Sequence, residues 1–373
     1  MINLPLSKLR DGMVTAQSIY NPRGTSFLTQ GMELNRHYID RLQKIGIENV
    51  VVTSLNPALK LKPPPNIVQE KTRITAIHCV SDIYDAVEKT GTFDTKILHN
   101  ISKTILHDLI DNRANLVQLT DIRLHDSYTF AHSVNVTVLS AMMGMLCHYS
   151  PQELTELTNG ALLHDLGKTI IPQDVLIKPA HLSADEEAIV RQHPKVGRDR
   201  LKAIPNLPPT AGYIAMQHHE HVDGSGYPNH MTAKQIHRFA KIVTIADVYD
   251  ALTSMRPYKK AYSPSVAYRI MKSAAGKQFD ADILKKFFDN VAIYPVGTIL
   301  RTKLGFGIVK RVDFGRTRTP VMCLFANADG KVLDTAIDID LYEHDADTIL
   351  GVLDGSELYH FVHQIHMDPA VLL

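Results

Sequence analysis

The feature that most constrains this chain is a set of histidine and aspartate residues that recurs through its middle. Successive groups are about 25 to 32 residues apart, roughly the length of a helix pair with its connection. Such spacing places one polar group on each of several helices. Side chains of this kind can converge in the core of a helical bundle. The set comprises His132, His164, Asp165, His193, His218, His219 and Asp247.

A lone histidine on a helix is more often a packed, hydrogen-bonded side chain than a metal ligand. The adjacent pair His164-Asp165 weakens that interpretation, because it follows the apolar run 161–163, where burying two polar side chains is costly unless something satisfies them. Seven donors exceed the four that a tetrahedral zinc accepts. The pattern therefore favours two divalent ions that share a bridging carboxylate, and donors without thiolate suit iron or manganese at least as well as zinc.

Helical periodicity dominates residues 67–293, which we expect to form an all-α domain. Ser150, Ser183 and Ser263 stand where helix N-caps belong, each followed by Pro or by an acidic residue. Before this domain, residues 1–55 predict a small mixed α/β module with a helix from about Asn35 to Ile45. A linker over 56–66 ends in three consecutive prolines.

After residue 293 the sequence becomes Gly-rich, with alternating apolar and polar residues. This pattern predicts a small antiparallel β unit over 294–345, after which we expect a helical tail over 346–373. The predicted fold class is thus a multi-domain, mainly α protein. A helical catalytic bundle is flanked by a mixed α/β module and a β unit.

The composition of the chain argues against nucleic-acid polymers and membranes as binding partners. Forty basic and 39 acidic residues give a net charge of +1, so no overall field attracts a nucleic-acid polymer or an anionic membrane. The three cysteines fit neither a disulfide framework nor a zinc ribbon. The N-terminus has no signal-peptide pattern, and the apolar run 134–146 is too short to span a bilayer. We expect a cytoplasmic protein.

Two motifs carry a family resemblance. His164-Asp165-x-Gly167-Lys168 precedes His218-His219-Glu220, which leads into the segment Asp223-Gly-Ser-Gly226-Tyr227-Pro228. Together they resemble the HD-GYP family of bacterial cyclic di-GMP phosphodiesterases, over about residues 126–288. The resemblance implies an HD-type helical bundle that hydrolyses cyclic di-GMP to pGpG, and in some members to GMP, through attack of a metal-activated hydroxide on phosphorus.

The same resemblance assigns the metal ligands. It implies one ion held by His132, His164, Asp165 and Asp247, a second held by His193, His218 and His219, and Asp165 as the bridge. Some members use a Glu four residues before the first His to hold a third ion, but Tyr128 occupies that position here. We therefore expect two ions, iron or manganese, and the product, pGpG or GMP, stays open.

Substrate residues follow by position as well. The resemblance implies that Arg256 and Lys259 bind phosphate and that Gly226 and Tyr227 shape guanine recognition. Lys168, with Asp165, is a candidate catalytic residue that stabilises developing charge; the alternative is a helix C-terminal lysine that interacts with the dipole. We expect the remaining acidic residues near the motifs to support ligands or structure: Asp223, Asp250 and Asp280.

Partners and alternatives complete the expectations. The resemblance implies contacts of the GYP loop with signalling proteins such as diguanylate cyclases, and a homodimer is compatible with the sequence. One alternative is a phosphohydrolase of another cyclic dinucleotide, because the metal cluster does not choose the base. The other is a catalytically weak receptor or adaptor, although no metal ligand is missing from this sequence.

Overall fold

The computed structural model describes residues 2–16, 19–20, 26–29, 31–44, 47, 49–52, 67–118, 128–176, 178, 181–254, 261–345 and 347–353. The chain divides into two compact units. One comprises Asn66–Phe288, and the other comprises Met1–Pro65 with Asp289–Leu373. The finer domain boundaries given above remain predictions.

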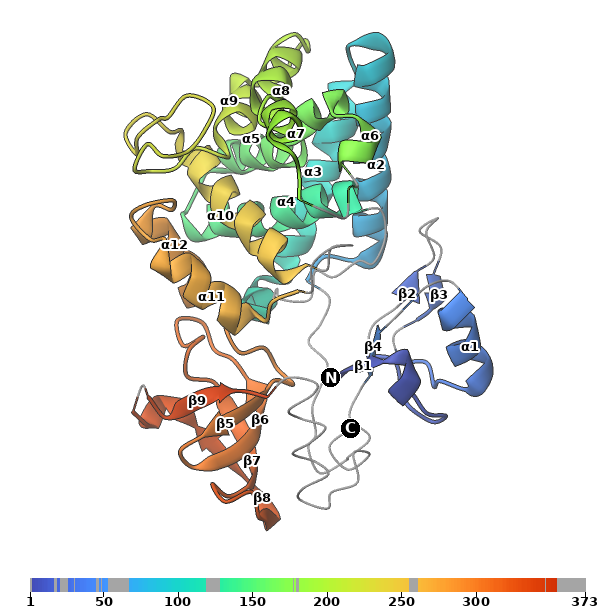
Figure 1. The fold of residues 1–373 in the computed structure, drawn as a ribbon, viewed down its shortest axis with the longest axis vertical. Helices are drawn as coiled ribbons and strands as arrows, with labels where there is room; N and C mark the ends of the chain where they lie inside the picture. Colours follow the sequence, from blue (N-terminus) through green and yellow to red (C-terminus); the bar gives the residue numbers. More distant parts are fainter. Residues whose placement is uncertain are drawn as a thin grey trace. The chain divides into compact units, whose positions relative to one another are not determined.

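The first unit is helical (Figure 1). No helix of the described residues is both long and apolar enough to cross a membrane. Its elements in chain order are α2 (Glu70–Thr90), α3 (Thr95–Asp111), η3 (Arg113–Gln118), α4 (Tyr128–Leu146), α5 (Pro151–Leu162), η4 (Leu166–Ile170), α6 (Gln173–Leu176), α7 (Ala184–Val190), α8 (His193–Lys202), α9 (Pro209–Gln217), α10 (Arg238–Thr253), α11 (Pro264–Ser273) and α12 (Ala281–Asn290).

Helix α4 is the centre of this bundle. It packs against α2, α5 and α10, and α5 packs in turn against α9. Every residue of α4 from 131 to 144 is buried, so polar side chains on it such as Asn135 and Ser140 lie inside the protein. A helix surrounded on all sides can present a ligand to the interior of the bundle.

The helix ends that the sequence predicted are confirmed. Ser150 and Ser183 each form a reciprocal capping box, with Glu153 and Glu186 respectively, and Ser263 accepts a hydrogen bond from the backbone N–H of Val266. These caps satisfy backbone donors that have no partner within the helix.

The N-terminal segment of the second unit is mixed α/β, as predicted. Strand β1 (Ile2–Pro5) pairs antiparallel with β4 (Asn49–Val52), and β2 (Ile19–Tyr20) pairs with β3 (Ser26–Leu28). The helix α1 (Arg36–Lys44) follows, and a short turn η1 (Leu6–Lys8) follows β1. The residues packed beneath them include Leu28, Leu34, Leu42 and Val52.

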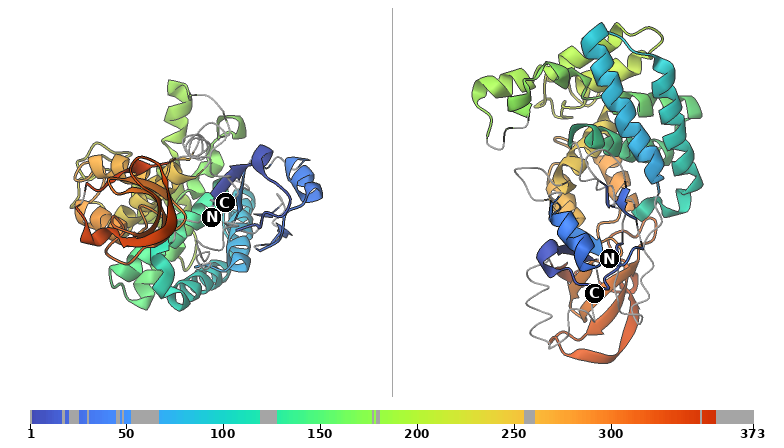
Figure 2. Two further views of the ribbon diagram at one scale, coloured as in Figure 1. Left: turned by 90° about the horizontal axis from the view of Figure 1, so that it is seen from below. Right: turned by 90° about the vertical axis from the view of Figure 1, so that its right-hand side faces the viewer.

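The C-terminal segment is a five-stranded antiparallel sheet in the order β8-β7-β6-β5-β9. Its strands are the orange and red arrows of Figure 2. Ile308, Cys323 and Phe325 lie in its core. The mainly α fold class with flanking mixed and β segments is thus confirmed. Its elements are β5 (Ile299–Thr302), β6 (Gly305–Arg311), β7 (Val321–Ala326), β8 (Val332–Asp340), η5 (Leu341–Glu343) and β9 (Ile349–Val352).

The helical tail expected from residue 346 is wrong for 349–352. These residues form β9, which pairs with β5, with Leu300 opposite Val352 and Thr302 opposite Ile349. On the edge of β5 that does not face β6, β9 pairs with the backbone N–H and C=O groups. This pairing between distant segments outweighs the local helical preference of residues 349–352. Residues 354–373 and the predicted linker 56–66 lie outside the described residues.

Candidate metal centre

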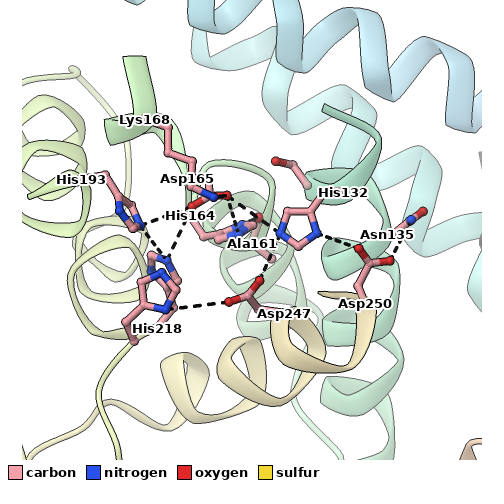
Figure 3. A network of polar contacts seen from close by, with 12 residues as sticks. His132, Asn135, Ala161, His164, Asp165, Lys168, His193, His218, Asp247 and Asp250 are labelled. Carbon is pink, nitrogen blue, oxygen red and sulfur yellow. Dashed lines mark hydrogen bonds and ion pairs between the residues drawn. The ribbon is translucent and has the colours of Figure 1, made fainter. Parts of the chain in front are cut away.

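The structure brings the seven predicted metal ligands together inside the helical unit (Figure 3). His132 lies on the buried helix α4, and Asp247 lies on α10, which packs against α4. The others stand at helix ends, where a side chain turns inward without interrupting the helix. His164 and Asp165 follow α5, His193 opens α8, and His218 and His219 follow α9.

Asp165 occupies the middle of the cluster. Its Oδ2 lies 3.4 Å from Nε2 of His164 and 3.9 Å from Nε2 of His132. Its Oδ1 lies 3.5 Å from Nε2 of His193 and 3.7 Å from Nε2 of His218. The two carboxylate oxygens therefore face different groups of histidines.

Donor atoms within 4.8 Å of one another fall into groups that correspond to the expected division. His193, His218 and His219 form one group, and His132, His164 and Asp247 form another. A third group joins His164 and His218 through Asp165.

Backbone carbonyls fix three of the imidazole rings. Nδ1 of His164 lies 2.8 Å from the carbonyl of Ala161, and Nδ1 of His193 lies 2.6 Å from that of Val190. Nδ1 of His218 lies 2.9 Å from the carbonyl of Ala215. A carbonyl only accepts, so each Nδ1 carries a proton, and each Nε2 faces the centre of the cluster.

A carboxylate fixes the ring of His132. Its Nδ1 donates to Oδ2 of Asp250 at 2.7 Å, while Oδ1 of Asp250 accepts from Asn135 and Ser254, both at 2.9 Å. The expectation that Asp250 supports a ligand is thus met by its geometry. The sequence did not predict the contacts of Asn135 and Ser254 with Asp250. Asn135 follows His132 by one helical turn within an apolar run, and this polar residue could have indicated a partner for a buried carboxylate.

The pKa values separate the histidines. Burial lowers the pKa of His193 to about 3, and burial together with His218 holds the pKa of His219 well below its ordinary value. Burial also opposes the charged form of His132, but hydrogen bonds to Asp247 and Asp250 outweigh it and raise its pKa to about 9. His193 and His219 are therefore neutral donors at physiological pH, whereas His132 must lose a proton before it can bind a metal.

Two buried atoms test whether a metal fits. Nε2 of His164 and Oδ1 of Asp165 are inaccessible and have no hydrogen-bond partner among the described residues. Leaving them so costs about 1–3 kcal/mol each. Two ligands about 2.1 Å from one ion at a tetrahedral angle lie about 3.4 Å apart, close to the spacings around Asp165. The donor set fits a metal centre.

Lys168 brings an ammonium group to this cluster. Its Nζ lies 2.5 Å from Oδ2 of Asp165, and its side chain keeps 24% of its surface exposed. Although burial opposes ionisation of Asp165, Lys168 and His164 hold the pKa of that carboxyl well below its usual range. Lys168 lies in the 3-10 turn η4 rather than at the end of an α-helix, so the macrodipole alternative loses its basis.

The segment after His219 forms a closed loop beside the cluster. Glu220 is 1% exposed and accepts hydrogen bonds from the backbone N–H groups of Asn229 and Met231, at 2.7 and 2.9 Å. A Cβ on Gly226 would lie 2.2 Å from the backbone nitrogen of His221, so only glycine fits there.

Tyr227 lies against His219, one of the predicted metal ligands. Its ring stacks on that of His219, with centroids 4.8 Å apart and planes 22° apart, and its backbone N–H donates to the carbonyl of His219.

Several residues expected at the site are either not described by the structure or make other contacts. Arg256 and Lys259 lie outside the described residues, and of Tyr128 only the backbone, at the start of α4, is described. Asp223 bonds the backbone of Ser225 within the loop, and Asp280 bonds the side chain of Lys241. For Asp223 and Asp280 the structural interpretation applies.

Comparisons with known proteins find similar sequences over the helical unit. Residues 105–283 match the model of the HD domain family. A cyclic di-GMP phosphodiesterase of Pseudomonas aeruginosa is 30% identical over 272 residues, covering 71% of this chain and 66% of that protein. A 3'3'-cGAMP-specific phosphodiesterase of Vibrio cholerae is 32% identical over 184 residues, covering 49% of this chain and 34% of that protein.

A solved structure supports the fold. It is described as an HDG"Y"P protein from Bdellovibrio bacteriovorus and superimposes with a TM-score of 0.52, covering 77% of this chain and 97% of that one, at 17% identity. The chain spans between about one third and two thirds of the lengths of the two curated relatives described above.

Proposed function

The chain belongs to the HD domain family, and from that premise we propose that it is a metal-dependent phosphodiesterase that hydrolyses cyclic di-GMP. The observation that carries the proposal is the position of Asp165, whose two oxygens face separate histidine groups while its Oδ2 contacts Lys168. The name of the Pseudomonas relative supports the choice of substrate.

We take the centre to hold two divalent ions, iron or manganese. When bound, they supply Lewis acidity toward a phosphoryl oxygen and lower the pKa of a bound water. His132, His164, Asp165 and Asp247 would hold the first ion, and His193, His218 and His219 would hold the second together with Asp165.

The chain's own residues then orient the reaction. Hydrolysis forms a bond from the oxygen of water to phosphorus and breaks one P–O bond of the ring. Negative charge grows on the non-bridging oxygens, and the ribose oxygen that leaves must gain a proton. Lys168 is partly exposed and its Nζ contacts the buried Asp165, so its ammonium group is placed to stabilise that charge and to supply the proton. Arg256 and Lys259 are the proposed phosphate contacts, and Gly226 and Tyr227 shape the base site.

A second candidate substrate is 3'3'-cGAMP, which the name of the Vibrio relative favours. The two substrates share the phosphodiester ring, so the metal centre serves either, and the loop around Tyr227 must discriminate between the bases. We also propose, from the family resemblance, that this loop contacts diguanylate cyclases.

Product analysis tests the function directly. Protein purified anaerobically and loaded with Fe²⁺ or Mn²⁺ should convert cyclic di-GMP to pGpG, with GMP as the further product if hydrolysis goes on. The metal content of the anaerobically purified protein, measured before loading, gives the number and identity of the ions. Equimolar competition between cyclic di-GMP and 3'3'-cGAMP ranks the substrates.

Asp165→Ala is the decisive variant. It removes the carboxylate that both histidine groups face, so turnover should disappear. Retained turnover would refute the bridging role. Metal-loaded wild-type protein that binds cyclic di-GMP without linearising it would instead establish a receptor or adaptor.

A further inference from the structure

Helix α7 has an unusual construction for so short an element. None of its seven residues, Ala184–Val190, is buried, so it contributes nothing to the core. It is nevertheless fixed at its start by the Ser183–Glu186 capping box, and Glu186 also receives two hydrogen bonds from Lys178, at 2.7 and 2.8 Å. Because this helix buries nothing, any role it has lies in the side chains that it positions.

At its C-terminal end α7 holds Arg191. Nε and Nη2 of Arg191 both donate to Oε1 of Glu187, one turn earlier, at 3.0 and 2.7 Å. An exposed ion pair of this kind contributes little to stability by itself. Its two bonds do, however, restrict the rotation of the guanidinium group.

The guanidinium group lies against Tyr227. Its central carbon is 4.9 Å from the centroid of the Tyr227 ring, within the range of a cation–π interaction. The same ring stacks on His219 at 4.8 Å. Arg191 and His219 therefore both contact the ring of Tyr227, which joins the end of an exposed helix to the candidate metal centre.

The loop leaves Tyr227 little freedom on its own side. The backbone of Tyr227 is bonded to His219, and Gly226 is packed against the backbone of Glu220 and His221. What remains free is the rotation and tilt of the phenol ring, and Arg191 is the described contact that restricts it from α7.

We propose that Arg191 is a positioning residue that holds the ring of Tyr227 against His219 and so keeps that imidazole oriented for the metal. The inference rests on the proposed function in taking His219 as a ligand. It extends the site to α7, two residues before the ligand His193, and makes metal affinity depend on an exposed salt bridge.

The test measures Co²⁺ binding, which does not require turnover. Arg191→Met should weaken Co²⁺ affinity by roughly two- to five-fold, the size of an exposed cation–π contact, and change the visible absorption of the bound ion. Arg191→Lys keeps a cation over the ring and should restore the affinity. Arg198→Met is the matched control. Arg198 lies on α8 and also forms an exposed ion pair, with Asp199 of the same helix.

A double-mutant cycle identifies the route of the effect. If Arg191 acts through Tyr227, Arg191→Met should change nothing further in a Tyr227→Leu background, because interacting residues are not additive. Additive losses would overturn the inference, and so would an unchanged Co²⁺ affinity combined with a raised KM for cyclic di-GMP, which indicates direct substrate contact. Failure of the wild type to bind Co²⁺ would instead refute the proposed function itself.

Discussion

Gly167 offers the sharpest test of how the metal centre is assembled. It lies two residues after Asp165, in η4, which packs against the first turn of α8. A Cβ at this position would be 1.9 Å from the carbonyl oxygen of His193 and 2.6 Å from the backbone nitrogen of Gly197. Both are backbone atoms, so no side-chain rotation relieves the clash.

The size of the effect follows from these distances. Ordinary contact begins at 3.4 Å, so Gly167→Ala must separate η4 from α8 by about 1.5 Å. That movement directly lengthens the 3.5 Å between Asp165 Oδ1 and His193 Nε2. We expect a loss of about 1–3 kcal/mol in the free energy of unfolding from overpacking, and a loss of about 10–100-fold in metal affinity.

Gly212→Ala is the matched control. Gly212 lies within α9, and its added Cβ would be 3.5 Å from a flexible carbon of Arg198. Alanine inside a helix is favoured over glycine by about 0.5–1 kcal/mol, so this variant should be as stable as the wild type or more so. Urea denaturation and calorimetric titration with Co²⁺ measure both effects. Gly167→Ala protein with wild-type stability and Co²⁺ affinity would refute the reasoning.

Three further predictions concern the surroundings of the centre. Asp250→Ala removes the partner of His132 Nδ1 and should lower Co²⁺ affinity by about 10–100-fold, whereas Asp280→Ala should leave it unchanged. Because its folded-state pKa is raised, His132 stabilises metal-free protein below pH 6.5, and this contribution is lost as pH rises through about 9. Co²⁺ affinity should rise over the same interval, and a flat profile would contradict the assignment. Glu220→Ala leaves two loop amides without their acceptor, so hydrogen exchange over 224–232 should accelerate; unchanged protection would argue against its role.

Much of the site was predictable because its signals are local. Helix ends follow from caps such as Ser150 and Ser183, and a histidine just after a helix reaches the carbonyl three residues earlier, as His164 and His218 do. The bundle type follows from the helical periodicity. These features depend on neighbours in the chain, so the sequence alone carries them.

The tertiary structure decided what depends on residues far apart in the chain. The bond between His132 and Asp250 joins positions 118 residues apart, and the pairing of β9 with β5 overrode a helical expectation. Arg191 on an exposed helix meets Tyr227 from a different loop. No local propensity encodes such contacts, because they arise only when packing fixes which surfaces meet.

By itself, the sequence determined the helical bundle and predicted the donor set and the loop that follows His219. Only the tertiary structure decided that the two oxygens of Asp165 face separate histidine groups and that Lys168 contacts one of them. The physical reason is that residue types specify which atoms can bind a metal, whereas close packing of η4 against α8 and of α4 against α10 fixes where those atoms point.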